Sequence, residues 1–231
     1  MPLYELDALR DQTRVFRDRA HAGHVLGEML VAHRDTNGRV FAIPAGGLPV
    51  AGPLARMLAL PLDVAVVSKI TLPWNSEVGY GAVAFDGSVR VNERLLSGLE
   101  LSDEELHQGI EETSEKVRRR VELLRGASAP LTATDRDVLL VDDGLASGFT
   151  MLTAVEALRQ AGARSVVVAV PTGSPRAIEG LAGLVDTVYC ANVRGGSSFA
   201  VADAYEDWSD VTEAEALDIL RRSREGRGSA D

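Results

Sequence analysis

The adjacent carboxylates Asp142 and Asp143 are the residues whose type and position point most directly to chemistry. They follow Val138–Val141, an unbroken apolar run that is typical of a strand buried on both faces in a parallel sheet. Open α/β sheets bind ligands at the carboxyl ends of their strands. A carboxylate pair at that place can accept hydrogen bonds from vicinal hydroxyl groups and attract a divalent cation. An ordinary strand-to-helix turn is the alternative, but buried paired carboxylates cost free energy without a ligand or a cation.

The segment that follows the acidic pair contains four small residues, namely Gly144, Ala146, Ser147 and Gly148. Small side chains let a ligand come close to the backbone, and the hydroxyl groups of Ser147 and Thr150 fall where the next helix should begin. Backbone N–H groups at the start of a helix favour a bound phosphate. The segment is therefore a candidate phosphate-binding loop.

Strand, acidic pair, small-residue loop and helix start together resemble the motif with which type I phosphoribosyltransferases bind phosphoribosyl diphosphate (PRPP). The resemblance implies that Asp142 and Asp143 are catalytic residues that hold the ribose hydroxyls. It also implies Mg²⁺ as the cofactor, bound by the same two residues directly or indirectly. The residues that would surround the 5′-phosphate are Gly144, Leu145, Ala146, Ser147, Gly148, Phe149 and Thr150.

A second candidate anion site follows the predicted strand Arg39–Ile43, where the chain reads Pro44, Ala45, Gly46 and Gly47. Two glycines let backbone amides face an anion, although a simple tight turn is the plainer interpretation. In the family that the chain resembles, the corresponding loop binds pyrophosphate, and related sequences often carry Arg at the position of Ala45. We therefore expect Ala45, Gly46 and Gly47 to bind pyrophosphate through backbone donors.

Lys69 follows the predicted strand Asp63–Val67, and the residues alone leave it open between a surface charge and a phosphate contact. The resemblance implies a catalytic, pyrophosphate-binding role for it. The next segment, Thr71–Val91, contains Asp86 and Gly87, a pair that is typical of a hairpin turn. The resemblance makes this segment a mobile hood that closes over PRPP.

Three aromatic residues, Phe199, Tyr205 and Trp208, are concentrated in the glycine-rich segment Asn192–Trp208. They either form a lid that stacks on an acceptor ring or anchor this segment to the core. We treat them as acceptor-binding candidates. The segment also resembles the tail of a bacterial phosphoribosyltransferase-like group whose acceptor is unassigned.

Apolar strands alternate with helical patterns along the chain, which favours a doubly wound α/β fold with right-handed crossovers. We predict one domain over residues 1–231, with a mainly parallel sheet of about five strands, flanking helices and a small hood. The hood is expected from about 71–91 and 192–208, and a loose tail from about 222–231. The predicted strands are Arg39–Ile43, Asp63–Val67, Val138–Val141, Ser165–Val170 and Thr187–Cys190, and the predicted helices are Arg14–Arg34, Leu48–Leu58, Ser102–Arg125, Met151–Gln160 and Pro175–Leu184.

Composition narrows the function further. A net charge of −10 and a pI near 4.9 argue against broad contact with nucleic acid or an anionic membrane. Cys190 is the only cysteine, so it cannot form an internal disulfide, which fits a reducing cytosol. No apolar run approaches membrane-spanning length, and the first twenty residues lack an apolar signal segment. We therefore expect a cytoplasmic protein with no nucleic-acid or membrane partner.

The main hypothesis is the transfer of a phosphoribosyl group from PRPP to a nitrogen of a small-molecule acceptor, a nucleobase or related heterocycle, with release of pyrophosphate. A non-catalytic sensor of PRPP or a nucleotide, with the same fold, is the alternative, and Ala45 in place of Arg favours it modestly. A flavodoxin-like phosphotransfer domain explains Ser147–Thr150 less well. Loops typical of P-loop ATPases, dinucleotide enzymes and α/β-hydrolases are missing. We also expect a homo-oligomer, namely a dimer.

Overall fold

Six parallel strands form the main sheet of this computed structural model, which describes residues 1–99, 101–126, 131–196 and 198–225. In spatial order they are β1 (Leu3–Tyr4), β9 (Thr187–Val193), β8 (Ser165–Gly173), β7 (Asp137–Val141), β2 (Arg39–Ala42) and β3 (Leu62–Val64). The predicted doubly wound α/β fold is confirmed. Strand β1 was not predicted, because two residues are too few to show a period, and it is held at the sheet edge by pairing with β9.

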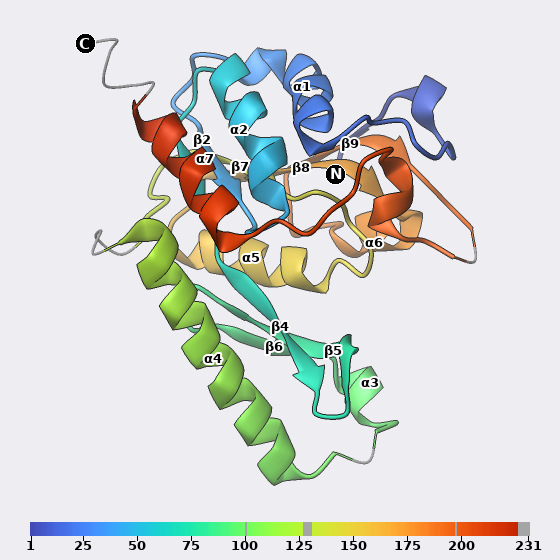
Figure 1. The fold of residues 1–231 in the computed structure, drawn as a ribbon, viewed down its shortest axis with the longest axis vertical. Coiled ribbons are helices and arrows are strands. Elements are labelled where there is room, and N and C mark those ends of the chain that lie inside the picture. The colour runs from blue at the N-terminus through green and yellow to red at the C-terminus, as the bar shows by residue number, and fades with distance from the viewer. Residues whose placement is uncertain (100, 127–130, 197, 226–231) are drawn as a thin grey trace.

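Helices cover both faces of the main sheet (Figure 1). One face carries α1 (Arg19–Met29), α2 (Gly47–Met57) and α7 (Glu213–Glu225), and the other carries α5 (Phe149–Gln160) and α6 (Pro175–Gly180). A hydrophobic core lies on each face of the main sheet. Strand β7 contributes side chains to both cores, because successive side chains of a strand point to opposite faces. Leu139 and Val141 are buried in the first core, and Val138 and Leu140 in the second. Burial on both faces explains the unbroken apolar run.

A second, antiparallel sheet lies beside the main one (Figure 1), and its strands are β4 (Val67–Leu72), β5 (Asn75–Ala84) and β6 (Val89–Val91). The predicted hairpin at Asp86-Gly87 is confirmed, since β5 and β6 pair on either side of it. After the short helix α3 (Glu93–Leu96), helix α4 (Asp103–Arg125) packs along β4 and β5. It starts with a capping box between Ser102 and Glu105. No helix within the described ranges is both long enough and apolar enough to cross a membrane.

The apolar run predicted as one strand, Asp63–Val67, is divided between the two sheets. Strand β3 ends at Val64 in the main sheet, and β4 begins at Val67 in the small one. Ala65 and Val66, which join them, are fully buried. Because both strands and the connection are buried, hydropathy gives no sign of the change of sheet.

The two segments that were expected to form one hood lie on different parts of the structure. Residues 71–91 belong to the small sheet, whereas residues 192–193 continue β9, and the 3₁₀ helix η3 (Val201–Ala204) packs against β8. The hydroxyl of Thr172 donates to the Asn192 side chain at 2.8 Å. The ring of Tyr205 lies 5.7 Å from that of Phe16. The first contact joins β8 to β9, and the second joins the residue after η3 to the segment before α1.

The first residues of the loose tail expected from about residue 222 are helical. Helix α7 continues through Glu225, and the rest of the predicted tail lies outside the described residues. A capping box between Thr212 and Glu215 starts this helix. Ala216 and Leu220 are buried against the main core, so packing holds a helix whose composition is mostly polar.

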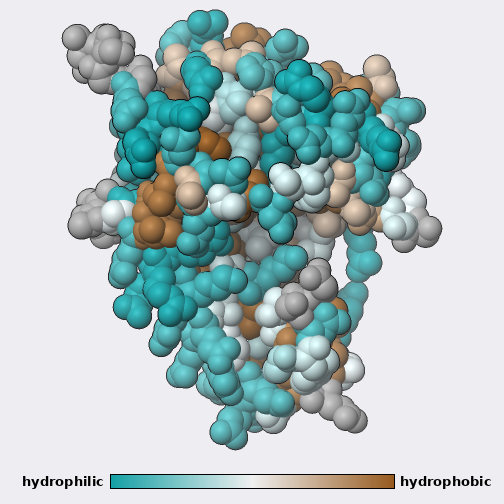
Figure 2. Space-filling view, in the orientation of Figure 1, coloured by the Kyte–Doolittle hydropathy of each residue, from teal (hydrophilic) through white to brown (hydrophobic). Residues whose placement is uncertain are grey.

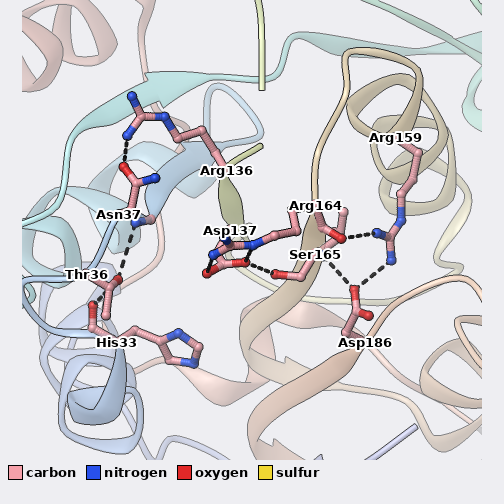
Figure 3. Close-up of polar contacts among 11 residues, drawn as sticks. His33, Thr36, Asn37, Arg136, Asp137, Arg159, Arg164, Ser165 and Asp186 are labelled. Atoms are coloured by element: carbon pink, nitrogen blue, oxygen red, sulfur yellow. Dashed lines mark hydrogen bonds and ion pairs between the residues drawn. The ribbon is translucent and has the colours of Figure 1, made fainter. Parts of the chain in front are cut away.

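Polar side chains join the strands at the amino edge of the main sheet, opposite the acidic pair (Figure 3). Asp137, the first residue of β7, accepts hydrogen bonds from the Nε atom of Arg164 at 3.0 Å and from the hydroxyl of Ser165 at 2.6 Å. Asp186, just before β9, accepts from the backbone of Val166 at 2.7 Å and from Arg159 at 2.6 Å. These contacts link β7, β8 and β9 where the strands begin.

Replacing Asp137 with Asn should destabilise the protein slightly at neutral pH. Hydrogen bonds from Arg164 and Ser165 lower the pKa of Asp137 below its usual range. Stability from a carboxyl with a lowered pKa is present above the unfolded pKa of about 3.9 and is lost as the pH falls through the folded pKa. The effect is small because the pair is partly exposed to water. Urea denaturation between pH 7 and pH 3 measures it.

The matched control is Asp35→Asn, which removes one exposed negative charge elsewhere on the surface. The difference in unfolding free energy between the wild type and Asp137→Asn should narrow toward acid pH, whereas the control should stay close to the wild type. A difference that does not change with pH would contradict the assignment of this stability to the ionised Asp137.

Candidate active site

The strand order brings two of the predicted loops together at the carboxyl edge of the main sheet. Strands β2 and β7 are neighbours and pair in register to their last residues, so the segments after them emerge side by side. A Cβ atom added to Gly46 would lie 2.1 Å from Oδ2 of Asp143, and one added to Gly47 would lie 2.7 Å from the carbonyl oxygen of Val141. Only glycine permits such an approach. The loop containing Ala45 therefore lies directly against the acidic pair.

The candidate phosphate loop is attached to the end of β8. The N–H group of Leu145 donates to the carbonyl of Thr172 at 2.9 Å, and the Leu145 carbonyl accepts from the N–H group of Ser174 at 3.0 Å. Gly148 has φ 77°, in the left-handed region that glycine adopts readily, and α5 begins immediately after it. Ser147 is exposed. The first N–H groups of an α-helix have no partner inside the helix, so this loop offers backbone donors beside the acidic pair.

Arg19 is the residue that holds Asp143. Its Nε atom donates to Oδ2 of Asp143 at 2.9 Å, and its Nη1 atom donates to the carbonyl of Ser209 at 2.8 Å. The guanidinium lies 3.7 Å from the centre of the Trp208 ring, a cation–π arrangement. The hydroxyl of Tyr205 donates to the Asp143 carbonyl at 2.6 Å. Side chain and backbone of Asp143 are thus both fixed from outside its own loop.

Sequence reasoning missed Arg19. The residue follows Asp18, which caps α1 by accepting a hydrogen bond from the N–H group of His21 at 2.7 Å. A charged residue in the first turn of a helix usually faces water, and Arg19 is 124 residues away from Asp143 in the sequence. No local pattern reveals a contact over that separation.

The three aromatic residues considered for the acceptor occupy two places. The ring of Phe199 lies 4.8 Å from the guanidinium of Arg194. Tyr205 is buried and its hydroxyl is engaged by Asp143, as expected of a residue that anchors the segment. The Trp208 side chain packs on Arg19, yet the residue is 38% exposed. Of the three aromatic residues, Trp208 is therefore the one that packs on the Arg19 guanidinium and is also substantially exposed to solvent.

The two carboxylates of the acidic pair are difficult to ionise together. Burial raises the pKa of Asp142 well above its usual range, and the charge of Asp143 adds to the rise. The positive charges of Arg19 and Lys69 oppose it. Burial also raises the pKa of Asp143, against the charge and hydrogen bond of Arg19. A cation or a set of hydroxyl donors would relieve this cost.

The donor set fits Mg²⁺ that arrives with a phosphorylated ligand. Mg²⁺ usually keeps several waters and binds one or two carboxylates together with substrate phosphates. Asp142 and Asp143 supply two carboxylates. Nowhere in the described part of the chain do three or more His, Cys, Asp or Glu side chains gather into a possible metal site. The protein residues alone therefore do not make a closed metal cage.

A cavity of about 540 Å³ lies between the main sheet, the small sheet and α4. Figure 2 shows the surface hollowed between the main body and the small sheet. Asp142, Thr150 and Lys69 all line the cavity, so the structure brings these three candidates together. Helix α4 also contributes four lining residues, namely Glu112, Thr113, Lys116 and Arg120.

The fold and the cavity together define a doubly wound α/β protein with a polar cavity at the carboxyl edge of its main sheet. A family model described as the phosphoribosyl transferase domain matches residues 26–180, and the chain belongs to this family. The resemblance inferred from the residues around Asp142 and Asp143 is thereby confirmed.

Relatives with known sequences or structures agree. Two curated proteins from Mycobacterium tuberculosis, whose names propose a phosphoribosyl transferase, are 32% identical to this chain over 210 residues. The match covers 91% of this chain and 47% of each relative, so the chain spans about half the length of the curated relatives it matches. The crystal structure of the protein TT1426 from Thermus thermophilus is similar with a TM-score of 0.72 and 35% identity, covering 90% of this chain and 98% of that one.

Replacing Asp142 with Asn should stabilise the ligand-free protein at neutral pH, because it removes a charge that burial disfavours. The folded pKa of Asp142 lies above the unfolded value of about 3.9, so folded chains bind more protons between the two values. Stability of the wild type therefore falls as the pH rises through that window. We expect the unfolding free energy of Asp142→Asn to exceed that of the wild type by on the order of 1 kcal/mol above this pH window, and to equal it below the window. Urea denaturation across pH, with exposed Asp135→Asn as control, tests this, and equal stability at pH 7 would refute it.

Replacing Arg19 with Gln should destabilise the protein strongly, because it leaves the carboxylate of Asp143 without its cation. The loss should lie near the lower end of about 3–5 kcal/mol, since Asp143 keeps some contact with water. Arg17→Gln is the matched control, because Arg17 pairs with Asp18 in full contact with solvent. Chemical denaturation of both variants provides the measurement. Equal stability of the two variants would show that the Arg19 contact does not support the site.

Proposed function

We propose that this protein transfers the 5-phosphoribosyl group of PRPP to a nitrogen of a nucleobase or related heterocycle and releases pyrophosphate. Membership of the phosphoribosyl transferase family supports PRPP-dependent transfer in general. The observation that carries the proposal is the convergence of the acidic pair, the glycine loop after β2 and the phosphate loop after β7 on one edge of the sheet.

In this proposal each loop binds one part of the donor. The loop from Gly144 to Thr150 holds the 5′-phosphate through backbone donors and the hydroxyls of Ser147 and Thr150. Asp142 and Asp143 accept hydrogen bonds from the two ribose hydroxyls. The diphosphate lies toward Ala45, Gly46 and Gly47 and toward Lys69. That each of these sets borders the acidic pair or the cavity supports the assignment.

The reaction forms a bond between the acceptor nitrogen and the anomeric carbon and breaks the bond from that carbon to the diphosphate oxygen. The bonding electrons leave with pyrophosphate, positive charge develops on the sugar, and the proton of the acceptor nitrogen is released to solvent. In this proposal the carboxylates of Asp142 and Asp143 balance that charge, and Lys69, which lines the same cavity as Asp142, balances the charge of the leaving group. Catalysis of this kind depends on position and electrostatics more than on proton transfer.

Mg²⁺, when bound, neutralises part of the diphosphate charge and orients its oxygens. Asp142 and Asp143 are the residues that would hold it, directly or through water. Water must be kept from the reacting carbon, since it competes with the acceptor. We propose that the β4–β5 hairpin within residues 71–91 closes over the bound donor, and that exposed Trp208 is the first aromatic residue to test for acceptor contact.

A thermal melt with PRPP and Mg²⁺ tests the proposal before the acceptor is known. A ligand at a hundred times its dissociation constant stabilises the native state by about 2.7 kcal/mol. For a protein of this size each kcal/mol raises the midpoint by about 2–4 °C, and the shift should shrink without Mg²⁺. Asp142→Asn and Asp143→Asn should each reduce PRPP affinity by about 1.5–3 kcal/mol, whereas the exposed Asp135→Asn should not.

The outcomes separate the candidate functions. Pyrophosphate release with some member of a nucleobase panel supports the transferase. Tight PRPP binding with no release across the panel favours a regulator that senses PRPP. The assignment of the PRPP site would be contradicted by the absence of a midpoint shift at millimolar PRPP. It would also be contradicted if both Asn variants bound PRPP with the affinity of the wild type.

A further inference from the structure

Both lysines of this chain line the same cavity, and Lys116 also lines a second hollow on α4. The sequence contains 24 lysine and arginine residues, and only Lys69 and Lys116 are lysines. They stand 47 positions apart, on β4 and on α4, and both line the cavity above Asp142. Arginine is the cation in ion pairs elsewhere in the structure, among them those of Arg19 and Arg164. This cavity is therefore the place where the two ammonium groups of the chain come together.

The lysines belong to a wall with further donors on α4. Arg120, one helical turn after Lys116, lines the same cavity, and its side chain is only 18% exposed. Its Nε atom lies 3.6 Å from Oε1 of Glu213, which keeps the guanidinium near the wall. Thr113, one turn before Lys116, adds a buried hydroxyl-bearing side chain. Residues three and four apart share one face of a helix, so these three side chains point the same way.

The floor of the cavity contains a polar atom that the protein leaves unsatisfied. Ser68 lines the cavity and is 5% exposed, and its hydroxyl has no hydrogen-bond partner among the described residues. A buried hydroxyl without a partner costs free energy. An oxygen-rich ligand that enters beside Lys69 would offer the missing partner. This observation is independent of the positive charges.

The order of elements along the sheet edge indicates which end of a bound donor meets this wall. The phosphate loop follows β7 and is fastened to β8, whereas Pro44 follows β2, the next strand on the other side. Beyond β2 lies β3, and α4 packs against β3 and β4. Consider a ligand whose 5′-phosphate binds the phosphate loop and whose ribose lies at Asp142. The end of this ligand opposite the 5′-phosphate therefore points toward α4.

We propose that Lys116 and Arg120 of α4, acting with Lys69 and Ser68, form the binding wall for the diphosphate group of the donor and guide its departure. The inference rests on the proposed function and adds α4 to the site. An ammonium group is a compact charge on a flexible stem, so Lys69 and Lys116 can follow a diphosphate as it leaves. The guanidinium of Arg120 gives the same anion a fixed, planar partner.

The acidic residues near this wall do not cancel its charge. Glu112 also lines the cavity, but it is exposed and its Oε1 atom accepts a hydrogen bond from Gln108 at 2.9 Å. Glu213 is 58% exposed and interacts with Arg120 from outside the lining. The remaining carboxylate of the lining, Asp142, belongs to the ribose site. In a chain of net charge −10, the described residues that line this cavity include three cations and two carboxylates, which favours an anionic ligand.

Calorimetric titration with two probes tests the inference. Inorganic pyrophosphate, with Mg²⁺ present, stands for the diphosphate end, and ribose 5-phosphate stands for the other end. Lys116→Gln should weaken pyrophosphate binding at least about tenfold, the effect of one lost charged hydrogen bond, and leave ribose 5-phosphate binding unchanged. Arg120→Gln should act in the same direction, and Lys116→Arg should retain most of the affinity because it keeps the charge.

Arg118→Gln is the matched control, since Arg118 is exposed on α4 and lines a different hollow, beside Phe85 and Asp86. It removes the same charge from the same helix and should leave both affinities unchanged. Equal weakening by Arg118→Gln and Lys116→Gln would overturn the inference in favour of a general charge effect. Unchanged pyrophosphate affinity in Lys116→Gln and Arg120→Gln would overturn it too, while a wild type that still binds ribose 5-phosphate keeps the proposed function. A wild type that binds neither probe overturns both.

Discussion

The burial of two adjacent carboxylates at the end of a strand is the constraint on which the rest of the site depends. Burial raises the pKa of both Asp142 and Asp143, so the folded chain needs other groups to keep them in place. Arg19 donates to one carboxylate, Tyr205 donates to the backbone of the same residue, and Gly46 leaves room for it. These partners come from the beginning, the end and the first third of the chain. Contacts from three distant parts of the chain thus converge on one acidic residue.

The two ends of strand β7 show how differently one fold can treat a carboxylate. At the amino edge Asp137 has strong partners in Arg164 and Ser165, and its pKa is lowered. At the carboxyl edge Asp142 is buried beside another acid, and its pKa is raised. The first arrangement stabilises the sheet by itself. The second one lowers stability until a ligand or a cation arrives, which is the usual relation between stability and a functional site.

The cavity exists because the chain leaves the main sheet at Ala65 and Val66 and builds a second sheet. That change of sheet carries Ser68 and Lys69 away from β3 and lets α4 return along the small sheet to cover the site. Helix α4 therefore has two faces with separate roles. One face packs on β4 and β5, and another lines the cavity with Lys116 and Arg120. Its charge pattern resembles an ordinary solvated helix, although part of it faces a ligand site.

The sequence by itself determined the strand-helix alternation, the hairpin at Asp86-Gly87 and the acidic pair with its loop, because each of these depends on neighbouring residues whose period or size is visible locally. Only the tertiary structure decided that Arg19 pairs with Asp143, that Trp208 packs on that arginine, and that α4 faces the cavity. It also placed the segment around η3 on the main sheet, apart from the hairpin. Such contacts join residues far apart in the chain, and their free energy comes from packing and electrostatics that no local pattern records.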